Sequence, residues 1–171
     1  MGWRDFTNAT NERTVISAFF PQSSVGYTSP LIFSSKSYDL WSCLLGNLSS
    51  LVLDYVARQA IGGTQLTYGY LKQFAILPPS FYTSSRRSFV LSRVLELTYN
   101  SDAMSSFAFD LGYDGPPFRW DEERRALLRS ELDCFYARSY VLFRNELRYV
   151  LDPNGRGLSQ RNLSRAQEQG D

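Results

Sequence analysis

The chain has 171 residues, of which 43% are hydrophobic and 15% aromatic, so it is long enough to bury an apolar core and general disorder is disfavoured. It contains no histidine, which excludes imidazole as a general base, a proton shuttle or a metal ligand. The formal net charge is +1, so the chain as a whole carries no charge signature of nucleic-acid binding.

The first predicted elements along the chain are two short strands. β-branched and aromatic residues run from Thr14 to Phe20 and stop at Pro21, and a second short strand is predicted from Pro30 to Phe33. The clearest helical pattern follows, from Leu40 to Ile61, with Gly62-Gly63 after it as a stop. Thr67 is then expected to cap a short helix that reaches Phe74, before Pro78 and Pro79 end helical geometry.

Charged residues become more frequent in the second half, where helical spacing dominates. Helices are predicted from Ser88 to Asn100, from a cap at Asp121 to about Tyr140, and from Arg144 to Leu151. The stretch 101–119 is expected to be a loop because it is rich in glycine and proline. Three arginines of the long helix are expected to form a solvated face paired with acidic neighbours: Arg124, Arg125 and Arg129 with Glu122, Glu123 and Asp133.

These elements predict an α+β fold. Residues 1–79 form a small β-containing region with one dominant helix, and residues 80–153 form a mainly α-helical region. Residues 154–171 are polar and nearly aperiodic, which predicts a disordered tail.

The two cysteines, Cys43 and Cys134, each lie in an apolar helical pattern, so both are expected to be free thiols in the core. A disulfide and a metal site are therefore disfavoured. The chain begins without a basic-then-apolar leader, and Asp54 and Arg58 interrupt its longest apolar run. These features predict a cytoplasmic protein without a membrane partner.

Five stretches of the chain carry a family resemblance through their order and spacing. They are Arg4-Asp5 through Ala9-Thr10-Asn11-Glu12-Arg13-Thr14, Leu48 through Arg58-Gln59 with Gly62-Gly63-Thr64-Gln65-Leu66, Arg93 to Tyr99, Pro116 to Arg125, and Glu146 to Pro153. Together they resemble the carboxy-terminal target-recognition, or specificity, region of adenine-specific DNA methyltransferases from restriction-modification systems.

The resemblance implies that the partners are double-stranded DNA and a methyltransferase catalytic domain that is missing here. The sequence has neither the glycine-containing loop that binds S-adenosylmethionine nor an Asn- or Asp-Pro-Pro-aromatic motif for the flipped base. At Gly115-Pro116-Pro117-Phe118 the glycine lacks the side-chain oxygen that accepts the adenine amino hydrogens. We therefore expect no enzyme activity and no cofactor in this chain alone.

By the same resemblance, the helix and loop before Pro78 are the DNA-binding part. The expected DNA-binding residues are Arg13, Arg58, Gln59, Gly62, Gly63, Thr64, Gln65, Tyr68 and Lys72. A glycine-rich turn brings backbone amides close to phosphate, and the threonine and glutamine offer hydrogen bonds to phosphates or base edges.

Structural alternatives stay open for several of these residues. Gly62-Gly63 is equally explained as a helix stop and Thr67 as a helix cap, and an ion pair of Arg13 with Glu12 or Asp5 is as well supported as a phosphate contact. An alternative function for the whole chain is a helical protein-interaction module that docks on a partner domain and never touches DNA.

The tail departs from the family pattern after Pro153. One set of synonymous codons for Gly155 to Asp171, read one base later, encodes Ala-Glu-Asp-Phe-Pro-Ser-Glu-Thr-Phe-Arg-Val-Leu-Lys, which restores that pattern. This favours the hypothesis of a gene fragment whose tail is frameshifted.

Overall fold

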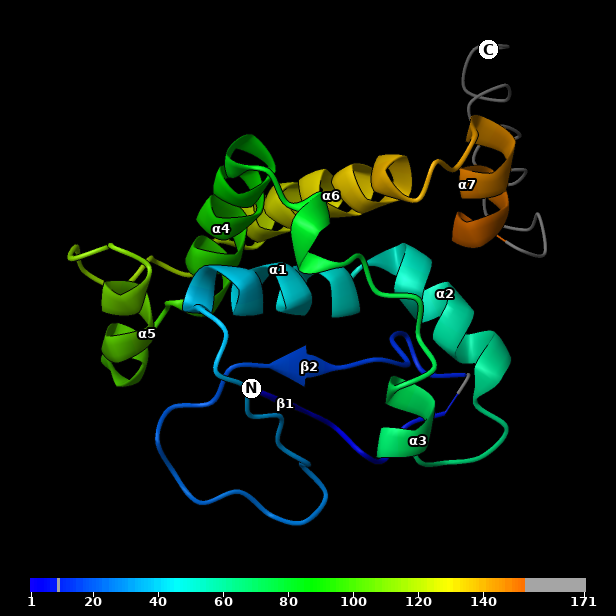
Figure 1. Cartoon of the computed structure of the whole chain (residues 1–171), viewed down its shortest axis with the longest axis horizontal. Coiled ribbons are helices and arrows are strands. Elements are labelled where there is room, and N and C mark those ends of the chain that lie inside the picture. Colours follow the sequence, from blue (N-terminus) through cyan, green and yellow to red (C-terminus); the bar gives the residue numbers. More distant parts are fainter. Residues whose placement is uncertain (9, 153–171) are drawn as a thin grey trace, which may run out of the picture.

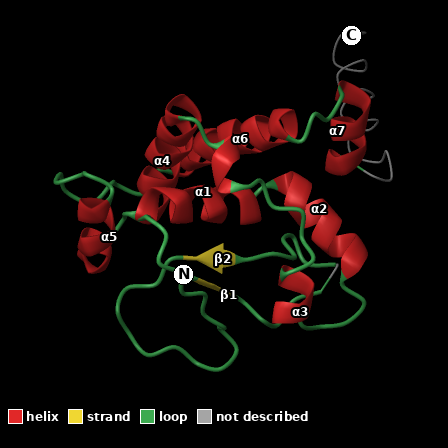
Figure 2. Cartoon of the chain, viewed as in Figure 1, coloured by secondary structure: helices red, strands yellow, loops and turns green. Residues whose placement is uncertain are grey.

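The computed structural model describes residues 1–8 and 10–152 (Figure 1). These residues form seven α-helices and one small two-stranded antiparallel sheet near the N-terminus (Figure 2). The expected combination of helix and strand is confirmed in this coarse form, with helices dominating. The tail predicted at 154–171 lies outside the described residues.

The sheet is much smaller than the sequence predicted. Strand β1 (Gly2–Trp3) pairs with β2 (Ser17–Ala18), with Gly2 opposite Ala18 and Trp3 opposite Ser17. Most of the strand predicted at 14–20 is not a strand, because the backbone amides of Thr14 and Val15 donate to the Asp54 carboxylate instead of to a neighbouring strand. The strand predicted at 30–33 is reduced to an isolated bridge between Leu31 and Gly2.

The first seven residues connect regions that are remote in sequence. Their backbone amides donate to carbonyl oxygens of three other segments: Arg4 to Ile16, Asp5 to Thr28 and Thr7 to Thr64, at 2.8, 2.9 and 3.0 Å. This extended segment therefore fixes the chain at Ile16, Thr28 and Thr64.

The helix predicted from Leu40 to Ile61 is in fact two helices, α1 (Tyr38–Leu48) and α2 (Leu51–Ala60), bent by 62°. The break falls at Ser50, whose backbone is extended and whose hydroxyl accepts a hydrogen bond from the Leu53 amide. A serine at this position stabilises the start of a second helix, because it satisfies an amide that the helix itself leaves unpaired. No single helix of the described residues is long and apolar enough to cross a membrane, although the bent pair passes that test together.

After α2, a short helix α3 (Tyr68–Leu71) and a 3-10 turn (Pro79–Phe81) lead into the second half. Helix α3 ends before the predicted Phe74, and Thr67 precedes it without a capping hydrogen bond from its hydroxyl. Ile76, Leu77 and Pro78 lie outside any helix, as predicted, but Pro79 begins the 3-10 turn.

The second half contains α4 (Ser84–Thr98), α5 (Ser105–Asp110), α6 (Glu122–Ser139) and α7 (Arg144–Leu151). The predictions for α6 and α7 are confirmed. The Asp121 side chain caps α6 by accepting a hydrogen bond from the Arg124 amide, and α7 has the predicted bounds. Helix α4 begins four residues before the predicted Ser88, because Thr83 provides the cap. The stretch 101–119 is not wholly a loop, since a 3-10 turn (Asp102–Met104) and α5 lie within it.

The buried apolar residues form two clusters. One lies between residues 1–18, which we call the N-terminal segment, and α2. It includes Trp3, Leu48, Leu53, Ala57 and Leu66. The other joins α1 to α4, α5 and α6 and includes Cys43, Val90, Val94, Phe107 and Tyr136. Helix α1 contributes to both clusters, so it connects the two parts of the chain (Figure 1).

Gly46 allows α1 to approach its neighbours closely. A Cβ atom at this position would lie 2.8 Å from the Tyr136 hydroxyl oxygen and 3.2 Å from Val90 Cγ1. The Tyr136 hydroxyl in turn donates to the Cys43 carbonyl oxygen at 2.9 Å. Any larger side chain at position 46 would displace this packing.

The two cysteines differ in environment, so the prediction that both lie in the core is wrong for Cys134. Cys43 is fully buried in α1, and burial raises the pKa of its thiol to about 12. Cys134 is exposed on α6. Its position on the helix turns it outward, although the local sequence is apolar.

We expect iodoacetamide at pH 8 to alkylate one thiol of the native chain quickly and the other only after unfolding, because the reactive species is an accessible thiolate. Intact-mass spectrometry measures this directly. Substituting Cys134→Ser should abolish the fast reaction, and fast double modification of the folded chain would contradict the assignment of Cys43 to the core.

Candidate nucleic-acid interface

The loop between α2 and α3 exposes polar side chains from a fixed backbone. Gly62, Gly63, Thr64 and Gln65 are exposed, while the next residue, Leu66, is fully buried. The Thr64 carbonyl oxygen accepts from the Thr7 amide at 3.0 Å, and the Leu66 amide donates to Asp5. The loop is therefore anchored on the N-terminal segment at its carboxyl-terminal end.

Trp3 strengthens this anchor from inside the core. Its indole Nε1 donates to the Leu66 carbonyl oxygen at 2.6 Å, and its ring meets the Tyr68 ring edge to face at 4.7 Å. Both contacts hold the backbone on which the exposed loop is built. Gln65 Nε2 lies 3.5 Å from Asp5 Oδ2, a long contact that leaves the amide available to another partner.

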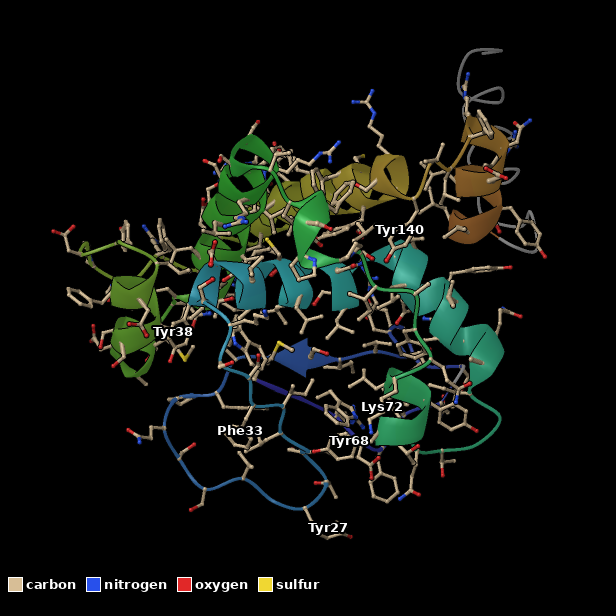
Figure 3. The ribbon with its side chains drawn as sticks, in the orientation of Figure 1. Tyr27, Phe33, Tyr38, Tyr68, Lys72 and Tyr140 are labelled. Atoms are coloured by element: carbon tan, nitrogen blue, oxygen red, sulfur yellow. The ribbon has the colours of Figure 1, made fainter. Side chains whose placement is uncertain are left out.

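Tyr68 is the first residue of α3 and Lys72 follows its last residue (Figure 3). The Tyr68 hydroxyl donates to the Leu31 carbonyl oxygen at 2.8 Å, while about half of its side chain is exposed. Lys72, just after α3, is exposed and has no ion-pair partner among the described residues. Tyr27 and Phe33, which the sequence analysis did not single out, are 88% and 83% exposed and appear toward the lower side of the view in Figure 3, as Tyr68 does.

The two loop glycines do not act as the predicted helix stop. Helix α2 is followed by Ile61 in an extended conformation, and neither glycine has a positive φ. A Cβ atom on Gly62 or Gly63 would meet nothing within 4 Å. The fold therefore leaves open space beside both residues, and nothing in its backbone geometry requires glycine there.

Arg58 is held inside the fold rather than presented at the loop. Its Nε donates to Asp54 Oδ2 at 2.9 Å, and its Nη2 donates to the Glu12 carbonyl oxygen. Asp54 is itself buried and accepts the Thr14 and Val15 amides. Arg58 thus joins α2 to the N-terminal segment. Gln59, the next residue, is exposed in the last turn of α2, directly before the loop.

Arg13 also lies apart from the loop residues. Its Nη2 is 3.6 Å from Asp133 Oδ2 of α6, so the ion pair exists but neither Glu12 nor Asp5 is the partner. Because Asp133 is 120 positions away, no local pattern indicated it. Tyr68 packs against Trp3, which also bonds to Leu66 at the end of the loop. Arg13 instead pairs with Asp133 on α6.

The arginines of α6 were predicted to pair with acidic residues of the same helix, and this is correct only for Arg129. Arg129 pairs with Glu122 at 2.9 Å, whereas Arg124 binds Glu96 of α4 through two hydrogen bonds. Arg125 stacks on the Trp120 ring at 3.8 Å and donates to the Leu97 carbonyl oxygen. Within residues 1–8 and 10–152, no group of three or more cysteine, aspartate or glutamate side chains is placed to hold a metal ion.

No protein-family model matches the chain, and neither a curated protein nor a solved structure matches it. The family resemblance and the function it implies therefore stand as proposals.

Proposed function

We propose that this chain binds double-stranded DNA through the loop 62–65 and α3, as the target-recognition part of an adenine-specific DNA methyltransferase of a restriction-modification system. One observation carries the proposal: an exposed polar loop is held at its carboxyl-terminal end, where Thr7 donates to Thr64 and Leu66 bonds to Asp5 and Trp3. A rigid backbone that presents exposed polar side chains is what base recognition requires.

The residue types of this surface fit the two kinds of DNA contact. Gln65 has the donor and acceptor pair that matches adenine in the major groove, and Thr64 contributes a hydroxyl. Lys72 supplies a positive charge for a backbone phosphate. The open space beside Gly62 and Gly63 lets a phosphate approach the loop amides without meeting a side chain.

In this proposal the chemistry belongs to a separate catalytic domain. That domain binds S-adenosylmethionine and transfers the methyl group, while this chain contributes DNA contacts and no catalytic group. Arg58 and Arg13 act as supports. Arg13 joins the N-terminal segment to α6 through an ion pair, and Arg58 joins it to α2 through a hydrogen bond to the Glu12 carbonyl oxygen.

The test is the binding of the full chain to a random-sequence DNA duplex pool, followed by selection of the duplexes it prefers. Lys72→Ala should weaken binding to every sequence, whereas Gln65→Ala should cost about 1–3 kcal/mol on the selected sequence alone. Arg124→Ala is the matched control, because Arg124 is bound to Glu96 on the helical side. Loss of binding in the control with no effect of the loop variants would show that the loop is misassigned.

A second candidate function, docking on a partner domain, has its own supporting observation. Large apolar side chains are exposed on α6 and just after it: Leu127, in the first half of α6, is 50% exposed, and Val141 and Phe143, between α6 and α7, are 72% and 73% exposed. Leu127 and Val141 line the same hollow. Exposed apolar residues that gather in one region favour a protein contact. If Phe143→Ser and Leu127→Ser both reduce self-association of the full chain in sedimentation while no DNA is bound, docking is the better account.

A further inference from the structure

A second polar surface lies between the N-terminal segment and α6, away from the loop 62–65. The largest hollow there has a volume of about 720 Å³ and is lined by Arg4, Arg13 and Arg129, with Asn11, Glu12 and Ser130 among its other residues. Two smaller hollows, of about 360 and 220 Å³, share Arg129 with it and add Arg125 and Ser17. We call this group of hollows the arginine cleft.

Three polar atoms on the walls of the cleft are buried without a hydrogen-bond partner among the described residues. They are Arg13 Nη1, Arg125 Nε and Ser17 Oγ. Unpaired buried donors are unfavourable, and those on charged groups most of all. All three belong to residues that line the hollows: Arg13 lines the largest and the smallest, Arg125 the one of about 360 Å³, and Ser17 the two smaller ones.

The acidic groups around the cleft leave its arginines incompletely neutralised. Asp133 pairs with Arg13 through Nη2 and Glu122 pairs with Arg129, while Glu12 lines the largest hollow. Burial raises the pKa of Asp133, which makes its negative charge less favourable. Among the described residues Arg125 forms no ion pair. Burial and then the charge of Arg129 lower its pKa, against the opposite effect of Glu122. Close arginines that repel one another are stabilised by a shared anion.

We propose that the arginine cleft binds one tetrahedral oxyanion, a phosphate group. Guanidinium groups from two sides of the cleft offer planar pairs of donors, which match phosphate oxygens, and Ser17 lines the two smaller hollows. The phosphate comes either from a nucleic-acid backbone or from a free phosphorylated molecule. In both cases the same donors bind it.

The site is separate from the recognition loop of the proposed function. None of the residues 62–65, Tyr68 or Lys72 lines any of the three hollows. Binding at the cleft therefore does not depend on the loop, and each site can be removed by substitution without touching the other.

The test titrates the full chain with inorganic phosphate in calorimetry, with sodium chloride at matched ionic strength as the reference. We expect one phosphate per chain and a rise in Kd of roughly tenfold in Arg129→Ala, the effect of losing a charge-assisted hydrogen bond. Arg4→Ala should weaken binding in the same direction. Arg124→Ala on the same helix and Lys72→Ala at the loop should leave the phosphate Kd unchanged.

Repeating the phosphate titration with saturating duplex DNA identifies the source of the phosphate group. If duplex DNA displaces phosphate and Arg129→Ala also weakens DNA binding, the cleft takes a backbone phosphate. If phosphate binds the DNA-saturated chain with the same Kd, it takes a free phosphorylated molecule. A phosphate response no larger than that of chloride, or an equal loss in Arg124→Ala, overturns the proposal, and neither result bears on the loop.

Discussion

Replacing Asp54 by alanine should lower the free energy of unfolding by about 3–5 kcal/mol, the cost of breaking a buried, hydrogen-bonded ion pair from one side. The carboxylate is 2% exposed and accepts the Thr14 and Val15 amides at 2.6 and 2.8 Å, in addition to Arg58. Alanine leaves two buried amides without an acceptor and Arg58 without its partner. Urea unfolding followed by far-UV circular dichroism measures the loss.

Two companion variants make this prediction specific. Asp54→Asn retains a carbonyl oxygen for the amides, so it should lose less than alanine does. Asp110→Ala, at the exposed end of α5, should change stability by less than about 0.5 kcal/mol. If Asp54→Ala proves as mild as Asp110→Ala, the carboxylate does not hold the N-terminal segment on α2.

Trp3→Ala should be similarly costly, at about 3–5 kcal/mol, because it removes the largest fully buried side chain and leaves a cavity. It also removes the donor to the Leu66 carbonyl oxygen and the ring against which Tyr68 packs. The loop 62–65 then loses part of its support. Circular dichroism is again the suitable probe, since the chain has two other tryptophans whose fluorescence would complicate the signal.

The variant Trp3→Phe separates packing from the hydrogen bond. It keeps most of the apolar ring but loses the indole donor, so we expect a smaller loss than for alanine together with faster amide exchange in the loop. Unchanged exchange in both Trp3 variants would contradict the role of this tryptophan in fixing the loop.

Local sequence patterns predicted the helices whose ends are set by their own residues. Helix α6 begins after Asp121, whose carboxylate accepts the Arg124 amide, with two glutamates in its first turn. Helix α7 needed only its apolar spacing and the following proline. In both, the cap and the pattern lie within a few residues of each other, so no distant contact decides the outcome.

The sequence did not predict features that depend on long-range contacts, or on one residue whose local hydrogen bond overrides the apolar pattern around it. Ser50 divides the predicted helix at 40–61 because its hydroxyl caps a new turn, although the apolar pattern continues through it. Helix α5 lies in a stretch whose glycines and prolines suggested a loop, yet Met104, Phe107 and Ala108 have helical spacing and are buried.

In the candidate site, too, local features could be predicted from the sequence and long-range contacts could not. The exposure of the loop 62–65 was predictable from its glycines and polar residues. The ion pair of Arg13 was not, because Asp133 became its partner only through the fold. Arg58 and Asp54 are four residues apart in α2, a spacing that favours an ion pair, whereas the hydrogen bond from Arg58 to the Glu12 carbonyl oxygen depends on the fold. The arginine cleft likewise combines Arg4 and Arg13 with Arg129, which are more than 100 positions apart in the chain.

The most direct test of DNA recognition by the loop is the salt dependence of the affinity for duplex DNA, measured for the unmodified chain and for Lys72→Ala. The account predicts weak binding whose logarithm falls linearly with the logarithm of salt concentration, with a slope that decreases in magnitude by about one in Lys72→Ala. Lys36→Ala, an exposed lysine outside the proposed interface, should leave the slope unchanged. Binding that is absent at low salt, or a slope that is identical in Lys72→Ala and the unmodified chain, would contradict the account.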